Sequence, residues 1–527
     1  MAVLESSPEG QARTPIVPGF YRHAEGNRPG GAITRSSALF YAASTEQLTT
    51  EILFTNYWRF KNAVEGVTLT STLRYGNGDV AARVILPIDF TGARRLRLAD
   101  LLSEASLPPA FEGSWELEFI ATCSLNVPYP AVVVRYSGPG WHSMTHTCCR
   151  ILSAASADDT ARIEALQRTC EGNWTVFPDR GVEAFFIVHN GPQAVGPHDL
   201  RLRLISHAGV VHEVVVPETC WGPYETRLCR LGDFLPDAPD LLGGQPGTIE
   251  IETLVNGVFP RLICGTRRLS DGAMSVDHSN FSYASAEGAR DTFSPNGSNR
   301  ELCFLLPTLA APEWRCFVDF YPTFPDRGYE VRMRGLDRDG HQCGTATRTL
   351  GTSDTNGPVR VEIDPLVQGA CEAASVDFDF RHASRLPRRF HMGIHYAYRD
   401  GLPAFIVDGP VPSDDRPLST RWCPVFATAE TRTQVLIAHR TFTGIERTVN
   451  IKATLFNAFD EPPLEASTTL APDHTLALDV RTFFGDAGSY LGSEPGWLFL
   501  KFDPPSHSVV HYLTLHGHNS VAADHAF

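Results

Sequence analysis

The chain has 527 residues, of which 43% are hydrophobic and 20% are charged. This composition is typical of a folded globular protein, and the length predicts roughly three to four domains. The formal net charge of −15 argues against general binding to nucleic acids or to an anionic membrane surface, because both are polyanions. No apolar run is long enough for a transmembrane segment.

Residues 1–34 are rich in Gly, Pro and Arg and show no periodicity, which predicts a flexible N-terminal tail. This segment has neither the basic region nor the apolar region of a secretory signal peptide, so we expect a cytoplasmic location. The 12 cysteines form no CxxC pair, which excludes the common zinc-ribbon and thioredoxin patterns. Whether the cysteines form disulfides is left open by their even number alone.

A hairpin turn marks an internal repeat. Asn77-Gly78 supplies the positive φ values that a two-residue hairpin turn needs. Gly209 and Gly340 lie in matching turns, each 131 residues after the one before. A fourth turn at Asn457–Asp460 follows after a shorter interval. This spacing indicates four copies of one structural unit, of which the last is shorter.

Two further landmarks recur at similar intervals. The first is a short apolar step, often after an aspartate, that predicts a turn of helix between two sheets; it begins at Leu101, Phe234, Leu366 and Phe483. The second is a strand that, in the first three copies, alternates apolar and acidic residues, as a half-buried strand should; the four strands cover residues 115–119, 249–252, 376–380 and 497–500.

Short strands, closely spaced turns and little helical periodicity favour a β-sandwich in each copy. The expected fold is all-β, with four tandem immunoglobulin-like or fibronectin-like β-sandwich repeats in a row and one short linker helix. This architecture resembles that of bacterial tandem immunoglobulin-like or fibronectin-like proteins. The predicted sandwiches cover residues 35–152, 173–293, 300–410 and 418–527.

The linker helix is predicted between the first two copies, at residues 153–172. Asp158-Asp159-Thr160 would cap its N-terminus. Ile163, Leu166 and Cys170 would share one apolar face, because they stand at positions i, i+3 and i+7.

Histidines gather near the last strand of each copy. Nine of the 19 histidines lie there, and they are His142, His146, His278, His391, His395, His511, His516, His518 and His525. Histidine is the commonest metal ligand among side chains, so this placement suggests sites that bind a divalent metal.

His516-Gly517-His518 is the first candidate metal site. Residues two apart on a strand face the same way, so both imidazoles would reach one ion, with His525 or Asp524 returning as a third ligand. The alternative is a solvated or hydrogen-bonded C-terminal tail.

The second candidate metal site combines His142, His146 and Cys148, whose ligand types suit zinc. The alternative is a loop with buried cysteines that behave as small apolar residues.

Four aromatic residues are candidates for a binding surface. Trp58, Trp221, Tyr396 and Tyr398 would form platforms for a glycan or a protein if they were exposed. The alternative is that these rings pack in the core, where large aromatic residues are usually found.

No G-x-S-x-G elbow, phosphate-binding loop or dinucleotide fingerprint is present, so no catalytic residue is assigned and no organic cofactor is expected. The favoured hypothesis is a non-enzymatic scaffold or binding protein that recognises a protein or glycan partner through its tandem sandwiches. The alternative hypothesis is a metal-binding protein or metal-dependent enzyme that uses the C-terminal histidines.

Overall fold

We describe the fold from a computed structural model of the chain. The structure describes residues 33–125, 128–153, 159–160, 163, 167–281, 303–322, 329–350, 357–370, 372–381, 383, 390–409, 418–440 and 447–527. The predicted N-terminal tail lies outside the described residues, apart from its last two positions.

The fold is all-β and consists of four β-sandwich repeats, numbered 1 to 4 along the chain, as the sequence predicted. Each repeat has eight core strands in two antiparallel sheets. The first, third, fourth and sixth strands form one sheet, and the second, fifth, seventh and eighth strands form the other. In repeat 2 a short ninth strand extends the first of these sheets to five strands.

Repeat 1 contains β1 (Arg35–Ser44), β2 (Thr49–Thr55), α1 (Tyr57–Asn62), β3 (Val67–Tyr75), β4 (Val80–Ile88), β5 (Ala93–Arg97), α2 (Leu98–Glu104), β6 (Phe111–Ile120), β7 (Val132–Gly138) and β8 (Trp141–His146). Repeat 2 contains β9 (Gln167–Val176), β10 (Val182–His189), β11 (Val195–Ile205), β12 (Val211–Trp221), β13 (Thr226–Arg230), α4 (Leu231–Phe234), α5 (Ala238–Leu241), β14 (Gly247–Val255), β15 (Ile263–Arg268), β16 (Met274–His278) and β17 (Asn280–Phe281).

Repeat 3 contains β18 (Cys303–Leu309), β19 (Trp314–Phe320), β20 (Tyr329–Asp337), β21 (Gln342–Leu350), β22 (Val359–Glu362), the 3₁₀ helix η4 (Asp364–Leu366), β23 (Ala373–Asp379), β24 (Met392–Tyr398) and β25 (Ala404–Val407). Repeat 4 contains β26 (Leu418–Val425), β27 (Thr431–Ala438), β28 (Val449–Phe456), β29 (Leu464–Leu470), β30 (Thr475–Asp479), α6 (Val480–Phe483), α7 (Ala487–Leu491), β31 (Gly496–Ser506), β32 (Val509–His516) and β33 (Ser520–His525).

The recurring apolar step forms the expected helical turn in every repeat. It is α2, α4, η4 and α6 respectively, and each of these turns follows the fifth strand of its repeat. The buried leucines of α2 show the reason, because Leu98, Leu101 and Leu102 close the core where the chain passes from one sheet to the other.

The prediction of a linker helix is wrong over residues 167–172. Strand β9 begins at Gln167, and its Cys170 pairs with Glu252 of β14. Ladder hydrogen bonds to β14 therefore override the weak helical spacing in this segment. Helical conformation is described only at Asp159, Thr160 and Ile163, and residues 154–158, 161–162 and 164–166 lie outside the description.

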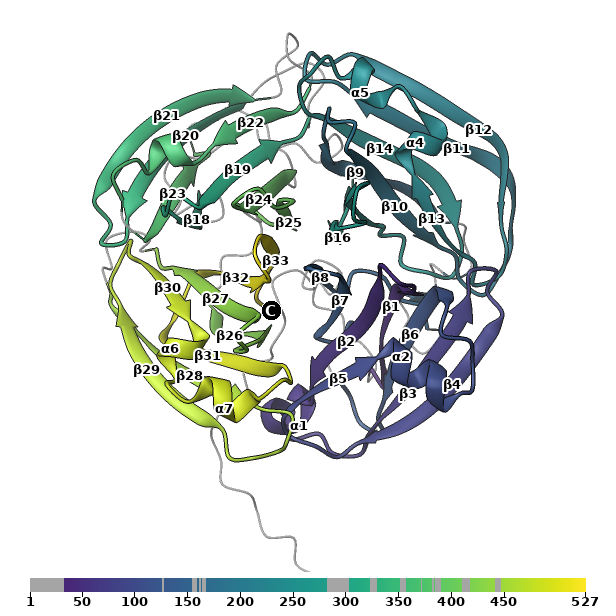
Figure 1. Ribbon diagram of the computed structural model, residues 1–527, viewed down its shortest axis with the longest axis horizontal. Coiled ribbons are helices and arrows are strands. Elements are labelled where there is room, and N and C mark those ends of the chain that lie inside the picture. Colours follow the sequence, from purple (N-terminus) through teal and green to yellow (C-terminus); the bar gives the residue numbers. More distant parts are fainter. Residues whose placement is uncertain are drawn as a thin grey trace, which may run out of the picture.

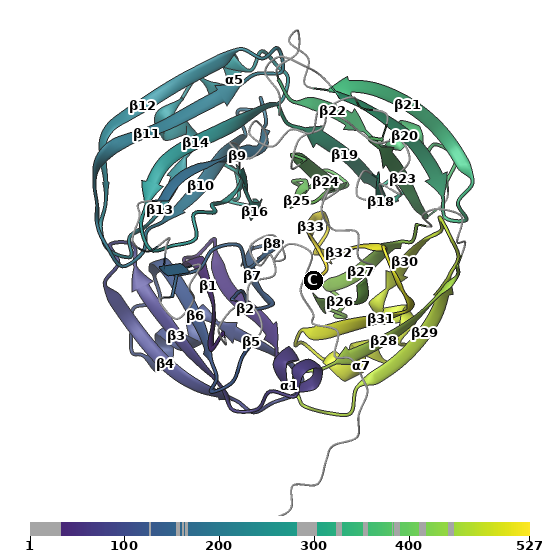
Figure 2. The same cartoon turned by 180° about the vertical axis from the view of Figure 1, so that it is seen from behind.

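The four repeats close into a ring instead of standing in a row (Figure 1). The last of the eight core strands of each repeat lies at the centre, where β8 packs against both β16 and β33, and β25 packs against the same two strands. The view from behind shows the same central group of strands (Figure 2).

A main-chain carbonyl oxygen accepts a hydrogen bond across every seam between repeats. In each seam the hairpin turn of one repeat meets the chain just before or at the start of the fifth strand of the next repeat. The donor–acceptor pairs are Thr226 N to Gly76 O (2.9 Å), His207 Nδ1 to Pro358 O (3.0 Å), Thr475 N to Arg338 O (3.0 Å) and Ala93 N to Asn457 O (2.8 Å). The last pair closes the ring between repeats 4 and 1.

The hydrophobic core crosses the repeat boundaries. One continuous cluster of buried side chains joins repeats 1, 2 and 4 and includes Phe405 and Val407 of repeat 3. A second combines most of the core of repeat 3 with five residues of repeat 4: Leu436, Leu513, Leu515, Val521 and Ala523. The sandwiches therefore do not have separate hydrophobic cores, because each shares apolar contacts with its neighbours. Among the described residues, no helix has both the length and the apolar character that crossing a membrane requires.

Candidate metal centre at the ring axis

Equivalent positions of the four repeats meet at the centre of the ring. His146, His278 and His525 are the final residues of β8, β16 and β33, and Asp408 directly follows β25. Three of the four repeats therefore bring an imidazole to the axis, and the remaining one brings a carboxylate. All four residues lie at the same end of their last strands.

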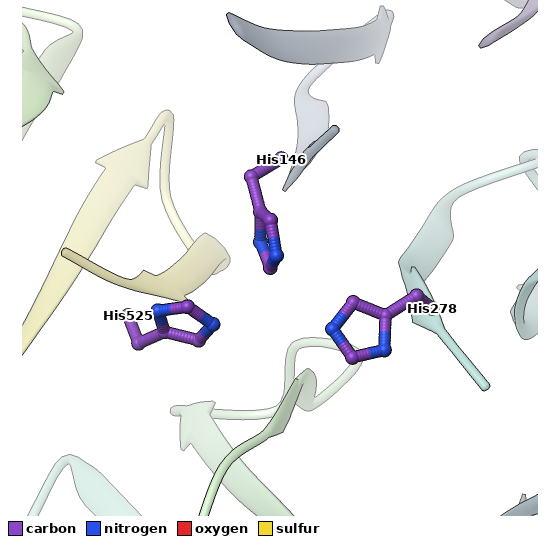
Figure 3. Close-up of side chains that lie close together, drawn as sticks. All are labelled: His146, His278 and His525. Carbon is purple, nitrogen blue, oxygen red and sulfur yellow. The ribbon is translucent and has the colours of Figure 1, made fainter. Parts of the chain in front are cut away.

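The three imidazoles are close enough to share an ion. One ring nitrogen from each of His146, His278 and His525 lies within 4.8 Å of the others. The ring centroid of His146 is 5.1 Å from that of His278 and 4.6 Å from that of His525. Figure 3 shows that His278 and His525 each turn a nitrogen towards the space between them, beside the ring of His146.

Hydrogen bonds from neighbouring groups fix two of the rings. Nδ1 of His146 lies 3.0 Å from Oδ2 of Asp524, so this carboxylate accepts a hydrogen bond from Nδ1–H and the lone pair of the neutral ring is on Nε2. Nδ1 of His278 lies 3.1 Å from the carbonyl oxygen of Ser279 and 3.5 Å from Nη1 of the buried Arg261, and these two contacts hold the ring in place. Such outer contacts set the tautomer and the direction of histidine ligands in metal sites.

Burial keeps the three histidines neutral. It lowers the pKa of His146 to about 4 and holds the pKa of His278 well below its usual value. The pKa of His525 is also lowered, chiefly by burial and then by the nearby His146. Because only the neutral imidazole carries a lone pair, these side chains are ready to coordinate a cation at neutral pH.

Two buried carboxylates lie under the histidines. Burial, with a further contribution from Asp524, raises the pKa of Asp277 to about 7. Burial likewise raises the pKa of Asp524 to about 6. Asp277 accepts hydrogen bonds from Thr145 Oγ1 at 2.9 Å and from the backbone N–H of Val407 at 2.5 Å. Asp277 therefore ties repeats 1 and 3 to repeat 2 at the axis.

Asp408 is the acidic member of the four equivalent positions. Its Oδ2 accepts a hydrogen bond from Nε2 of His511 at 2.9 Å, and its Oδ1 accepts from the backbone N–H of Gly409 at 2.7 Å. Burial raises the pKa of Asp408, but the His511 hydrogen bond and the nearby His525 outweigh it and hold the pKa below its usual value. About a quarter of this side chain is exposed to solvent.

The donor set fits a divalent transition metal. Three neutral imidazoles suit zinc, copper, nickel or iron(II). Zinc–nitrogen bonds of about 2.0–2.1 Å require nitrogens about 3.3 Å apart, so His146, His278 and His525 would need only a small inward movement. Asp408 holds the equivalent position of repeat 3, but its Oδ2 accepts a hydrogen bond from His511, so the proposed ligands are the three histidines alone.

The predicted group of His516, His518 and His525 is not one site in the structure. His516 pairs with Ser520 at the turn end of the β32–β33 hairpin, whereas His525 pairs with His511 at the open end. At about 3.3 Å per residue these ends are about 16 Å apart. His516 is hydrogen-bonded to Thr431 Oγ1 at 2.7 Å, and the exposed His518 lies 2.8 Å from Arg399.

The predicted group of His142, His146 and Cys148 is also divided. His142 stands four residues before His146 on β8, about 13 Å away in an extended strand. Nε2 of His142 is hydrogen-bonded to the carbonyl oxygen of Thr514 at 2.8 Å. The ring centroids of His142 and His516 are 5.1 Å apart. Cys148 is buried. Ring closure thus places the two predicted clusters side by side but pairs His146 with His525.

The predicted aromatic platforms are wrong. Trp58, Trp221 and Tyr396 are each 1% exposed, and Tyr398 is 7% exposed. Burying a large aromatic ring removes much apolar surface from water, and every one of these rings lies inside the core. Tyr396 also has its hydroxyl satisfied internally, since it donates to the carbonyl of Pro307 at 2.5 Å.

His278, Asp277 and Asp408 were not among the predicted ligands. The signal was present in the sequence, because histidines recur near the last strand of each copy. Aligning the copies on those strands, instead of searching for ligands close together in the chain, would have placed His146, His278 and His525 at one position.

Comparisons with known proteins identify no family. No family model matches the chain, and no curated protein matches it. A solved structure of a biofilm-associated protein BSP domain is 10% identical over 95% of this chain and 98% of its own, with a TM-score of 0.15. A glycosyl hydrolase family 2 member from Bacteroides cellulosilyticus is 7% identical over 93% and 92%, with a TM-score of 0.12. A calcium-binding mutant of Bacteroides uniformis β-glucuronidase 2 is 10% identical over 43% and 26%, with a TM-score of 0.11.

Proposed function

We propose that this chain is a metal-binding protein in which one divalent transition metal joins the repeats at the ring axis. The observation that carries the proposal is the convergence of His146, His278 and His525, each from the end of the last strand of its own repeat. Three neutral imidazoles that meet from separate elements form a donor set that divalent transition metals prefer.

The ion would act first as a cross-link. His146 belongs to repeat 1, His278 to repeat 2 and His525 to repeat 4, so one ion spans three repeats and both halves of the chain. A metal that binds only the closed ring stabilises it in proportion to its affinity. This role agrees with a non-enzymatic scaffold that presents the outside of the ring to a protein or glycan partner.

A second role is favoured by the exposure of Asp408. Three protein ligands with an open fourth position are typical of catalytic zinc sites, which lower the pKa of a bound water. The half-buried His525 and the partly exposed Asp408 mark the side from which a substrate would approach. Hydrolysis of an activated ester by the zinc-loaded protein, lost in a His278→Ala variant, would support this role over the purely structural one.

Metal content is the direct test. Tag-free protein is stripped with a chelator, reloaded with zinc, desalted and measured by mass spectrometry. We expect about one zinc per chain in the wild type and in the control variant His518→Ala, and less than about one tenth of an equivalent in His278→Ala. His518 is the matched control because it is exposed and contacts Arg399, away from the axis.

The melting temperature checks the same proposal independently. Zinc should raise the melting temperature of the wild type and of His518→Ala but leave that of His278→Ala unchanged. A folded His278→Ala variant that keeps a full equivalent of zinc would overturn the proposal, as would a wild type that retains none.

A further inference from the structure

A cavity of about 140 Å³ lies at the seam between repeats 1 and 2, away from the central histidines. Its walls come from both repeats: β1, the β1–β2 turn and β6 on one side, and β10, β13, β15 and β16 on the other. Charged and apolar side chains share the lining, among them Glu112, Glu183, Phe185, Arg230, Arg267 and Met274. A volume near 150 Å³ accommodates a molecule the size of benzene, so a ligand of about six to nine non-hydrogen atoms fits.

The floor of this cavity is apolar. Phe185 is 1% exposed and Met274 is 5% exposed, and Leu228 and Leu48 complete the apolar lining. A branched aliphatic or small thioether side chain would remove its own surface and that of the floor from water. The apolar part of a ligand therefore belongs on this floor.

The rim of the cavity carries charges of both signs. Arg267 is half-buried, and among the described residues its guanidinium has no hydrogen-bond or ion-pair partner. Arg230 lies on the same rim and makes only a long contact of 3.7 Å with Glu183. Glu112 accepts a hydrogen bond from the buried Tyr41 hydroxyl at 3.0 Å. A half-buried arginine without a partner is a ready site for a carboxylate, which it binds in a planar, two-pronged geometry.

We propose that this cavity binds a small zwitterionic amino acid with an apolar side chain. The carboxylate lies against Arg267 with Arg230 beside it, the ammonium group lies against Glu112 and Glu183, and the side chain lies on Phe185 and Met274. This pattern of two cations and two anions around an apolar floor matches a zwitterion better than a simple fatty acid or an amine, because either of those leaves one pair of charges facing the ligand without a counter-charge.

Three probes that share the isobutyl group of leucine test this assignment in the full-length protein. L-leucine carries both charges, 4-methylpentanoate carries only the carboxylate, and 3-methylbutylamine carries only the ammonium group. We expect calorimetry to give a dissociation constant for L-leucine below about 1 mM, and binding at least about tenfold weaker for the other two. Equal binding of 4-methylpentanoate would overturn the zwitterion assignment, and no binding of any probe would overturn the site.

Arg267→Gln and Arg268→Gln form a matched pair of variants. Arg268 is the next residue of β15 but pairs with Asp271 at 2.6 Å and does not line the cavity. We expect Arg267→Gln to weaken L-leucine binding at least about tenfold and Arg268→Gln to leave it unchanged. Unchanged binding in a folded Arg267→Gln protein would overturn the site. The zinc content of both variants stays at the wild-type level, so failure here is distinguishable from failure of the central metal site.

Discussion

The backbone N–H of Ala93 donates a hydrogen bond of 2.8 Å to the carbonyl oxygen of Asn457, and this bond joins the first repeat of the chain to the last. Around it, Asp460 accepts from the backbone N–H of Gly92 at 2.9 Å and from Arg94 Nη2 at 2.6 Å. The ring is thus closed by the same kind of turn that lies in the other three seams.

Gly92→Ala should open the closing seam. A Cβ atom at this position would stand 1.9 Å from the carbonyl oxygen of Asn457, which is backbone and cannot rotate away. We expect a loss of about 2 kcal/mol or more in the free energy of unfolding, measured in urea. Gly196→Ala is the control, because its Cβ would meet nothing within 4 Å, and it should change stability by less than about 0.5 kcal/mol. Equal stability of the two variants would contradict this account.

Asp460→Asn should weaken the same seam in a pH-dependent manner. Burial raises the pKa of Asp460, but the hydrogen bonds from Gly92, Arg94 and Thr91 outweigh it and hold the pKa below its usual value. The ionised carboxylate therefore stabilises the fold above the unfolded pKa of about 4, and this contribution is lost as the pH falls through the lower folded pKa.

Because 38% of the Asp460 side chain is exposed and solvent screens its charge, we expect Asp460→Asn to lower the free energy of unfolding by only about 0.5 kcal/mol at pH 7, and by less as the pH falls below about 4. Asn is a suitable replacement because the backbone at this position has a positive φ of 57°, which Asn tolerates. Urea unfolding at pH 7 and at pH 3 measures the difference. A cost that grows towards acid pH would show that the carboxylate does not act as described.

Asp319→Asn should lower the free energy of unfolding far more than Asp460→Asn does, because Asp319 lies in a buried polar cluster between repeats 2 and 3. Arg360 donates to both of its oxygens at 2.8 Å, and Thr175 of the neighbouring repeat donates at 2.5 Å. Removing this charge leaves Arg360 largely buried without its counter-ion, which costs about 3 kcal/mol. Asp199→Asn, which breaks the exposed pair with Arg201, should cost less than about 0.5 kcal/mol. Similar losses in the two variants would contradict the assignment.

A fragment of repeats 1 and 2, residues 33–281, should not behave as a well-packed monomer. Its central strands and its faces towards repeats 3 and 4 would be exposed, including Tyr57, which stacks on Trp422 at 6.3 Å. We expect strong binding of a hydrophobic dye and association on size-exclusion chromatography. A monomeric fragment that melts at the temperature of the full chain would show that the repeats are independent after all.

The sequence predicted the repeated unit well because the relevant signals are local. The hairpin glycines Gly78, Gly209 and Gly340 have φ values of 93°, 77° and 80°, a conformation that side chains disfavour, so they mark turns directly. The segment around Cys170 was predicted as helix because three apolar residues at helical spacing do not exclude a strand. Its true state depends on pairing with β14, more than 70 residues further on.

Ring closure and the metal centre could not be read in the same way. The seams use main-chain atoms such as Gly76 O and Asn457 O, and a carbonyl oxygen looks the same at every position of a sequence. His146 and His525 meet only because the last repeat returns to the first. Their separation along the chain gives no local spacing that a search for metal-binding motifs would detect.

Closure also limits how a chain of this kind can change over generations. An open array gains or loses a unit at its end with little effect on the rest, whereas a ring in which each seam turns the path by about a quarter of a circle accepts neither three nor five units. Variation is therefore directed into the units themselves. The four equivalent axial positions, with histidine at three and Asp408 at the fourth, show what such a constraint permits: copies that stay alike in shape while one common position is specialised copy by copy.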